Sequence, residues 1–320
     1  MSKPRIAVIG AGKFGQNHVR HLSVHPGAEL VAVADPNPAA RAQFPTLPTL
    51  ADYRELVGRI DCAVVAAPSS QHAEIGGVLL AAGIDVLMEK PIAEDSAGAN
   101  RLIELATVHG RILQIGHLER FNPAVEALAA KIKLPLFFEV HRLSAFSPRS
   151  LDIDVVLDLM VHDLDLLLAF TGQLPCAIHA AGIRVLSAKV DIANVRLEFP
   201  SGCVANLTAS RVSTEQVRKL RLFQPHEYHS LDFAKQELFS IQAGGPGGFQ
   251  FNHAAIAKCD ALLSELNEFI DCVITRRQPR VDGAAGRQAL HLALAIIAKI
   301  EEHARIVEAT LAEHNRQPAK

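Results

Sequence analysis

The stretch IAVIGAGKFGQNHVRHL, residues 6–22, constrains the fold more than any other part of the chain. An apolar strand pattern runs directly into Gly10, Gly12 and Gly15, and an amphipathic helix pattern follows at once. A dinucleotide-binding turn requires this order, because the first glycine permits a tight turn, the second admits a pyrophosphate and the third allows close helix packing. The alternative is a tight strand-to-helix turn that binds no ligand.

An acidic residue stands where such a turn needs one. A second apolar strand, residues 29–35, ends in Asp35, twenty residues after Gly15. A carboxylate there can accept hydrogen bonds from ribose hydroxyls and would repel a 2′-phosphate. Pro36 and Asn37 follow rather than an arginine, so we expect the cofactor NAD in preference to NADP.

The first third of the chain alternates apolar runs with amphipathic stretches, which indicates a parallel sheet covered by helices on both faces. We therefore expect an α/β chain whose residues 1–117 form a doubly wound Rossmann domain. The expected strands span residues 5–10, 29–35, 62–68, 85–91 and 111–117.

After Gly116 the pattern changes. The segment 176–242 alternates polar and apolar residues between turn signals, which favours an antiparallel sheet. Residues 118–320 are therefore expected to form a second α/β domain with an open, mostly antiparallel sheet. Its other expected elements are a helix from residue 122, a strand over 136–144, an apolar helix over 155–172 ended by Gly172, and closing helices over 257–277 and 286–314.

Composition argues against several classes of function. Of the 320 residues 49% are hydrophobic and 21% charged, and the net charge is −2, which gives no electrostatic case for nucleic acid or an anionic membrane. The five cysteines show no C-x-x-C pair and no metal-ligand spacing, so we expect free thiols in the cytoplasm and no metal site. No apolar run reaches the length that crosses a bilayer.

Two further patterns point to acid–base chemistry. Lys90 follows a strand at the carboxyl edge of the expected parallel sheet, where ligands bind in such folds. Asp158 and His162 stand four residues apart on the apolar helix, and a carboxylate beside an imidazole favours a general base near neutral pH. The same residues could instead be a surface lysine, a core histidine, a surface ion pair or two metal ligands.

The ordered motifs GAGKFGQNHVRHL, AAPSSQHAEI, EKP, GHLERFNPAV and DLMVHDLDLLL resemble the Gfo/Idh/MocA family, which includes glucose-fructose oxidoreductase and inositol dehydrogenase. The segment ELNEFIDCVITRRQPRVDGAAGRQAL is similar to the closing helices of that family, so the resemblance runs from about residue 5 to residue 300. It implies a Rossmann domain, a second domain whose open sheet is commonly an oligomer interface, and oxidation of a sugar or polyol hydroxyl by a nicotinamide cofactor. A homodimer or homotetramer is therefore expected.

The resemblance also implies roles for single residues. Lys90, Asp158 and His162 fall on the catalytic positions of the family, with His162 as the base. The cofactor-binding residues that we expect are Gly10, Gly12, Lys13, Phe14, Gly15, Asp35, Pro68, Ser69, His72, Glu89 and Lys90.

The motifs GHLERFNPAVEAL and DLMVHDLDLLL are most similar to the branch that oxidises the 3-hydroxyl of UDP-N-acetylglucosamine. The 3-keto product of that branch goes to a later PLP-dependent aminotransferase, as in lipid A precursor synthesis. A diphosphate favours arginine, whose fork matches phosphate oxygens. We expect Arg120, Asn122 and Arg149 to bind substrate, with Arg142 and Arg211 as further arginines in this part of the chain. A dehydrogenase of a free polyol such as inositol, and an NAD-binding regulator without catalysis, remain alternatives.

Overall fold

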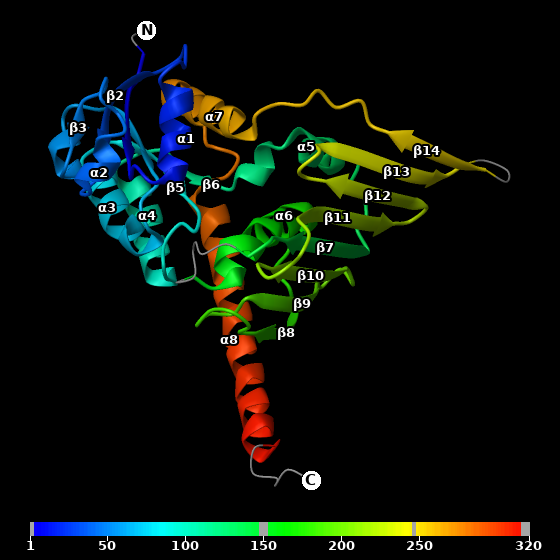
Figure 1. Cartoon of the computed structure of the whole chain (residues 1–320). Coiled ribbons are helices and arrows are strands. Elements are labelled where there is room, and N and C mark those ends of the chain that lie inside the picture. The colour runs from blue at the N-terminus through cyan, green and yellow to red at the C-terminus, as the bar shows by residue number, and fades with distance from the viewer. Residues whose placement is uncertain (1–2, 147–152, 245–247, 315–320) are drawn as a thin grey trace. The chain divides into compact units, whose positions relative to one another are not determined.

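The computed structural model of the chain describes residues 3–146, 153–244 and 248–314. Within these ranges the chain forms two compact units (Figure 1). The first unit joins the residues up to Phe121 with Asp260–Leu290, and the second joins Asn122–Cys259 with the residues from His291 onward. The expectation that residues 1–117 and 118–320 are separate domains stays a prediction, which expression of each piece alone would test.

The first unit contains a six-stranded parallel sheet of order β3-β2-β1-β4-β5-β6. The order reverses between β1 and β4, and open sheets of this kind bind ligands at the carboxyl ends of the strands beside such a reversal. The expected doubly wound sheet is thus confirmed, and only the short β3 was not expected. The strands are β1 (Arg5–Ile9), β2 (Glu29–Ala34), β3 (Thr49–Leu50), β4 (Cys62–Val65), β5 (Asp85–Glu89) and β6 (Leu113–Gly116).

Helices cover both faces of this sheet. Val19 of α1 and Phe269 of α7 share one apolar core with Leu87 of β5, so these two helices lie on the same face. On the other face α3 packs closely on α4. The helices are α1 (Lys13–Leu22), α2 (Pro38–Arg41), α3 (His72–Ala81), α4 (Ser96–Val108), α7 (Ala261–Thr275) and the first turns of α8 (Gly283–His314), with single 3-10 turns η1 (Tyr53–Leu56), η2 (Ser69–Gln71) and η3 (Leu118–Phe121).

The second unit contains an eight-stranded sheet of order β14-β13-β12-β11-β7-β10-β9-β8. The strands β7 and β10 pair in parallel, and the other neighbours pair antiparallel, so the sheet is mixed but mostly antiparallel, as expected. The strands are β7 (Phe137–Leu143), β8 (Ala177–Ile183), β9 (Ile192–Glu198), β10 (Val204–Ser210), β11 (Val217–Gln224), β12 (Glu227–Asp232), β13 (Glu237–Ala243) and β14 (Phe249–His253).

One face of this second sheet carries its core. Burial alternates along β7 and β9, because successive side chains of a strand point to opposite faces. The Phe138 and Phe170 rings stack at 6.2 Å, which places α6 on the buried face. The expected hairpin turn joins β9 to β10 through Gly202, whose φ is +83°. The helices of this unit are α5 (Pro123–Ala129), a π-helical turn η4 (Val156–Met160), α6 (Val161–Thr171) and the rest of α8.

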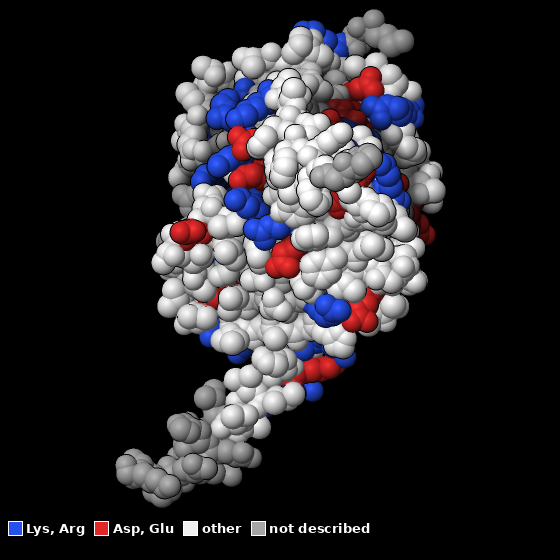
Figure 2. Space-filling model, turned by 90° about the vertical axis from the view of Figure 1, so that its right-hand side faces the viewer, with Lys and Arg blue, Asp and Glu red and all other residues white. Residues whose placement is uncertain are grey.

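Two properties of the surface bear on possible partners. None of the described helices has the length and apolarity that a bilayer-crossing segment needs. On the face that Figure 2 shows, Lys and Arg side chains are interspersed with Asp and Glu around uncharged areas. That face therefore carries mixed charge rather than a single basic field.

Candidate active site

The three glycines of the first turn are required for three different reasons. Gly10 has a φ of +94°, and a Cβ atom there would lie 2.5 Å from the Ala66 carbonyl oxygen of the neighbouring β4 loop. At Gly15 a Cβ would lie 1.8 Å from the Gly10 oxygen, so this glycine lets α1 approach the turn. At Gly12 a Cβ would meet nothing within 4 Å. The space over Gly12 is therefore open, as a turn that admits a phosphate group requires.

Asp35 lies directly after β2 and is fixed from two sides. Its Oδ2 accepts a hydrogen bond from the Ala11 backbone N–H at 2.7 Å, and its Oδ1 accepts one from the Asn37 N–H at 2.8 Å. A carboxylate oxygen has lone pairs for further donors, so Asp35 can still accept from hydroxyl groups. The nearby Arg41 guanidinium donates to the Asp35 and Pro36 carbonyl oxygens at 2.7 and 3.0 Å.

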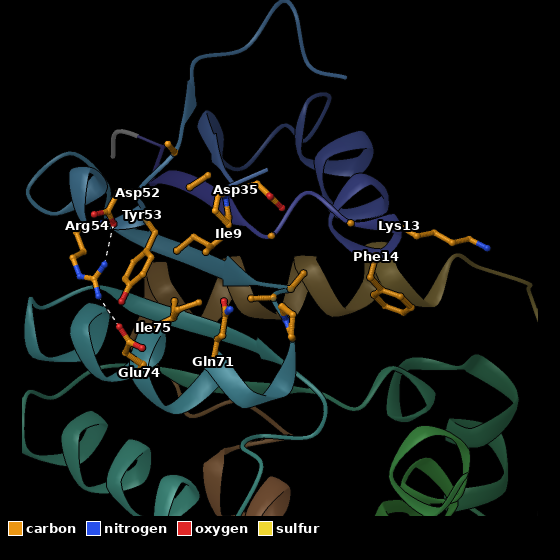
Figure 3. A pocket seen from close by; sticks show the side chains of 18 residues that line it. Ile9, Lys13, Phe14, Asp35, Asp52, Tyr53, Arg54, Gln71, Glu74 and Ile75 are labelled. Atoms are coloured by element: carbon orange, nitrogen blue, oxygen red, sulfur yellow. Dashed lines mark hydrogen bonds and ion pairs between the residues drawn. The ribbon is translucent and has the colours of Figure 1, made fainter. Parts of the chain in front are cut away.

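A cavity of about 820 Å³ opens at this edge of the first sheet (Figure 3), within the size range of small-molecule sites. Six of the expected cofactor-binding residues line it: Gly10, Gly12, Lys13, Phe14, Asp35 and Pro68. The far wall was not predicted from the sequence. It is formed by Asp52, Tyr53, Arg54, Gln71, Glu74 and Ile75.

The unpredicted wall is held by an ion-pair network. Arg54 Nη2 donates to Glu74 Oε1 at 2.6 Å, and Nη1 donates to Asp52 Oδ1 at 3.3 Å (Figure 3). Asp52 also accepts from the Arg54 backbone N–H and so begins the turn η1. The pattern Asp52-x-x-Glu55 directly after a strand is a helix-start signal, and with β3 recognised it could have located this wall.

The other expected cofactor residues lie outside the cavity lining. Ser69 begins the turn η2. His72 is buried, and its two ring nitrogens lie 2.8 Å from the Pro91 oxygen and 2.9 Å from the Ala67 oxygen, so it connects the chain after β4 with the chain after β5. Burial lowers the pKa of His72.

Glu89 and Lys90 stand at the carboxyl end of β5. Glu89 is its last residue, and the Glu89 Oε1 atom lies 2.7 Å from His18 Nε2 of α1. Lys90 follows and is half-buried. Both residues therefore lie at the ligand-binding edge of the first sheet, where the sequence placed them.

Asp158 and His162 lie in the second unit, and both are half-buried. The expected helix is present and ends at Gly172, whose φ is +62°. It begins differently from the expectation, because Asp158 sits in the π-helical turn η4 while His162 sits in the first turn of α6. π-helical insertions in α-helices are frequent at functional sites. The convergence of these two residues with Lys90 stays a prediction.

Among the expected substrate-binding residues, Asn122 has a local structural role. Its Oδ1 accepts from the Ala124 N–H and so begins α5, while its Nδ2 donates to the Phe233 oxygen. Arg120 lies in the turn η3 and is half-buried, and Arg149 lies outside the described residues. Substrate binding by these three residues stays a prediction.

The two further arginines form buried ion pairs. Arg142 binds Asp163 through two hydrogen bonds of 2.8 and 2.7 Å. Arg211 donates to Asp191 at 2.9 Å and to the Ile153 oxygen at 2.8 Å. Both arginine side chains are no more than 5% exposed, so these guanidinium groups are paired inside the second unit and do not offer an open phosphate site.

Comparison with known proteins decides the family. Residues 4–117 match the model of an oxidoreductase family with an NAD-binding Rossmann fold, and residues 139–223 match the GFO/IDH/MocA C-terminal domain. The chain belongs to the Gfo/Idh/MocA family. It is therefore an NAD(P)-dependent oxidoreductase, which confirms the resemblance and the class of enzyme expected from the motifs.

Three relatives of this Gfo/Idh/MocA chain are informative. UDP-N-acetylglucosamine 3-dehydrogenase from Acidithiobacillus ferrooxidans is 35% identical over 312 residues, which cover 93% of this chain and 97% of that protein. Its solved structure has a TM-score of 0.89, with 95% of this chain and 99% of that chain covered. An inositol 2-dehydrogenase from Acidothermus cellulolyticus is 34% identical, but over only 51% of this chain and 52% of its own length.

The third relative supports the fold alone. An oxidoreductase from Agrobacterium radiobacter, solved in complex with NAD+, L-tartaric acid and magnesium, has a TM-score of 0.83 at 17% identity and covers 94% of this chain and 97% of its own. In the part of this Gfo/Idh/MocA chain that the structure describes, no three His, Cys, Asp or Glu side chains are grouped as metal ligands would be.

Proposed function

We propose that this chain oxidises the 3-hydroxyl of UDP-N-acetylglucosamine to a ketone, with NAD as the hydride acceptor. The observation that carries the proposal is the 35% identity to UDP-N-acetylglucosamine 3-dehydrogenase, which extends over 93% of this chain. The likeness spans both units, so it includes the part that a Rossmann domain shared by many dehydrogenases would not explain.

The pocket residues fit a nicotinamide dinucleotide. The open space over Gly12 and the backbone N–H groups of the first turn of α1, which have no partner within the helix, suit a pyrophosphate. Asp35 suits a ribose diol and disfavours a 2′-phosphate, which supports NAD over NADP. When bound, the cofactor supplies the hydride acceptor, and the protein supplies position and electric field.

His162 is the proposed general base, which takes the proton of the substrate hydroxyl onto an imidazole nitrogen. Lys90 donates a hydrogen bond to the same oxygen as negative charge develops there, and Asp158 orients the imidazole or the sugar. A positioned base of this kind contributes about 10²- to 10⁴-fold in rate. Arg120, Asn122 and Arg149 are the proposed contacts of the nucleotide sugar.

The proposed setting is a cytoplasmic homodimer or homotetramer. Its product, a 3-keto nucleotide sugar, has the carbonyl group that a PLP-dependent aminotransferase consumes. Such an enzyme is therefore the proposed partner in the reaction sequence.

The experiment is incubation of the purified chain with UDP-N-acetylglucosamine and either NAD or NADP, with reduced-cofactor absorbance as the readout. We expect turnover with NAD and much less with NADP. His162→Ala should lower kcat by about 10²- to 10⁴-fold while the Kd for NAD changes less than about twofold. His179→Ala is the matched control, because His179 is an exposed histidine of the same unit.

The outcome of this experiment distinguishes the proposed function from its alternatives. Wild-type turnover by His162→Ala would remove this residue from its assigned role. Turnover of myo-inositol in place of the UDP-sugar would favour a free polyol as substrate, which the partial likeness to inositol 2-dehydrogenase supports. Tight NAD binding without turnover of any sugar would favour the non-catalytic regulator.

A further inference from the structure

Four buried polar side chains lie on β5 and on the strand and helices that pack beside it, and we call them the carboxyl-end cluster. They are His18 of α1, Glu89 of β5, Gln114 of β6 and Glu265 of α7, all from the first unit. His18, Gln114 and Glu265 are fully buried, and Glu89 is 7% exposed. Burial of so many polar groups in one place is costly unless their hydrogen bonds are satisfied.

Contacts connect the members of this cluster in two pairs, and the charge of Glu89 acts on Glu265. His18 Nε2 lies 2.7 Å from Glu89 Oε1, and because a carboxylate oxygen only accepts, the imidazole N–H is the donor. Gly116 pairs with Glu89 in the sheet, and a Cβ there would lie 2.9 Å from Glu89 Oε2, so glycine leaves the room that this carboxyl group occupies. Gln114 Nε2 donates to the Glu265 backbone oxygen at 3.2 Å.

Several atoms of the cluster have no hydrogen-bond partner among the described residues. They are both carboxyl oxygens of Glu265, the amide oxygen of Gln114 and Nδ1 of His18. An ionised carboxylate without donors in an apolar core is strongly disfavoured, and such a group takes up a proton instead. Burial raises the pKa of Glu265 well above its usual range, and the negative charge of Glu89 raises it further.

The other charged groups near α7 do not neutralise Glu265. His21 of α1 lies 3.2 Å from Asp260, and Glu268 is bound by Arg277 and Arg280. The segment after β6 carries His117, Glu119 and Arg120, and none of these hydrogen-bonds the Glu265 carboxyl group. Among the described residues, the charged group that acts on Glu265 is thus Glu89, which carries the same sign.

We propose that Glu265 is a positioning residue of the active site, which as a neutral acid lets Glu89 stay against His18 and so fixes the strand end that carries Lys90. The inference rests on the proposed function, because Lys90 must act on the substrate for its position to matter. Ionised Glu265 would place a second negative charge beside Glu89. An apolar side chain would remove the O–H group that can donate to an unpartnered acceptor of the cluster.

The proton on Glu265 can be observed directly. A protonated carboxylic acid has a carbonyl stretch in the infrared that is separate from the bands of carboxylates and amides. The difference spectrum between wild type and Glu265→Gln at neutral pH should contain this band. The matched control is Asp271→Asn, which removes an exposed carboxylate of the same helix and should give a carboxylate band instead. A carboxylate band for Glu265 would overturn the proposal.

The positioning role of Glu265 is tested by measuring kcat in two variants. Glu265→Gln keeps a neutral polar group of the same size and should keep kcat within about twofold of wild type. Glu265→Leu should lower kcat at least tenfold with the Kd for NAD within about twofold, since displacement of a catalytic group by about 1 Å can cost on the order of a hundredfold in rate. Wild-type kcat in Glu265→Leu, or an equal loss in Glu265→Gln, would overturn the role.

These outcomes are separable from failure of the proposed function. The infrared measurement and the NAD titration need no sugar, so they test Glu265 even when UDP-N-acetylglucosamine does not react. The infrared measurement also remains decisive when Glu265→Leu fails to fold, because it uses only Glu265→Gln, which keeps a neutral polar side chain of the same size.

Discussion

Two buried carboxyl groups, Glu265 in the first unit and Asp191 in the second, differ in their contacts. Asp191 Oδ2 accepts hydrogen bonds of 2.6–2.9 Å from three successive backbone N–H groups, those of residues 185–187, and Oδ1 accepts from Arg211 at 2.9 Å. The oxygens of Glu265 have no such donor among the described residues. The two groups are equally hidden from solvent, so burial alone does not decide what a carboxyl group does.

The same contrast extends to other buried groups of the two units. In the second unit Arg142 and Asp163 form a two-bond ion pair. In the first unit Gln114 and His18 are also buried, but each has an atom without a hydrogen-bond partner among the described residues. A buried charge pair makes the fold depend on both partners, whereas buried groups that lack partners require another explanation, such as a functional role.

The largest effect on stability is expected from breaking a complete pair. Asp191→Ala leaves Arg211 buried without its carboxylate and removes the acceptor of three N–H groups. The free energy of unfolding should fall by about 3–5 kcal/mol, measured by urea denaturation. The control is Glu198→Ala, whose pair with Arg196 is exposed and should contribute less than about 1 kcal/mol. Equal losses in the two variants would contradict the comparison.

A smaller and more specific effect is expected from alanine substitution of two glycines. One of them borders open space in the first unit, and the other is tightly packed in the second. A Cβ at Gly12 meets nothing within 4 Å, whereas one at Gly182 of the second unit would lie 2.7 Å from Ile300 and 2.8 Å from Val190. Gly12→Ala should weaken NAD binding about tenfold, or about 1.4 kcal/mol, without loss of stability. Gly182→Ala should cost about 1–3 kcal/mol of stability and leave NAD binding unchanged.

Calorimetric titration with NAD and thermal unfolding of both variants check this pair of expectations. Loss of stability in Gly12→Ala would show that the added methyl group disturbs the packing of the turn, and that the space over Gly12 is not open. An unchanged NAD affinity would show that no phosphate group passes over this glycine.

The glycine turn and Asp35 could be predicted from the sequence because their requirements are local. Gly10 needs a positive φ and Gly15 a close backbone approach, and both follow from a strand that runs directly into a helix. The open sheet of the second unit was also predictable, since alternation of polar and apolar residues specifies which side chains face the core. These features depend on a few neighbouring residues of the chain.

Features that depend on distant contacts could not be predicted. The pairing of Arg142 with Asp163 follows from the packing of α6 on β7, and the wall at Arg54 follows from the short strand β3. Glu265 left a sequence signal, because it falls within the apolar stripe of α7 with Leu262 and Phe269, where a carboxyl group is out of place. Only the structure shows that Glu89 lies near it.

The smallest expected effect is on the pH dependence of stability. The free energy of unfolding should change with pH in opposite directions for the contributions of the two units. Lys133 holds the pKa of Glu227 at about 2, below its usual 4.5, so the second unit should lose stability as pH falls from about 4.5 toward 2. Glu265 has a raised pKa, so the folded state binds more protons than the unfolded state above pH 4.5, and the first unit should lose stability as pH rises.

Urea unfolding from pH 3 to pH 9 separates these two contributions. Glu227→Gln should flatten the acid side of the profile by up to ~1 kcal/mol, a modest amount because its main partner Lys133 is exposed. Glu265→Gln should flatten the descent above pH 4.5 and leave the acid side unchanged. If both substitutions changed the acid side of the profile, Glu265 would be ionised and hydrogen-bonded in the folded state. The two units would then not differ in the protonation of their buried carboxyl groups.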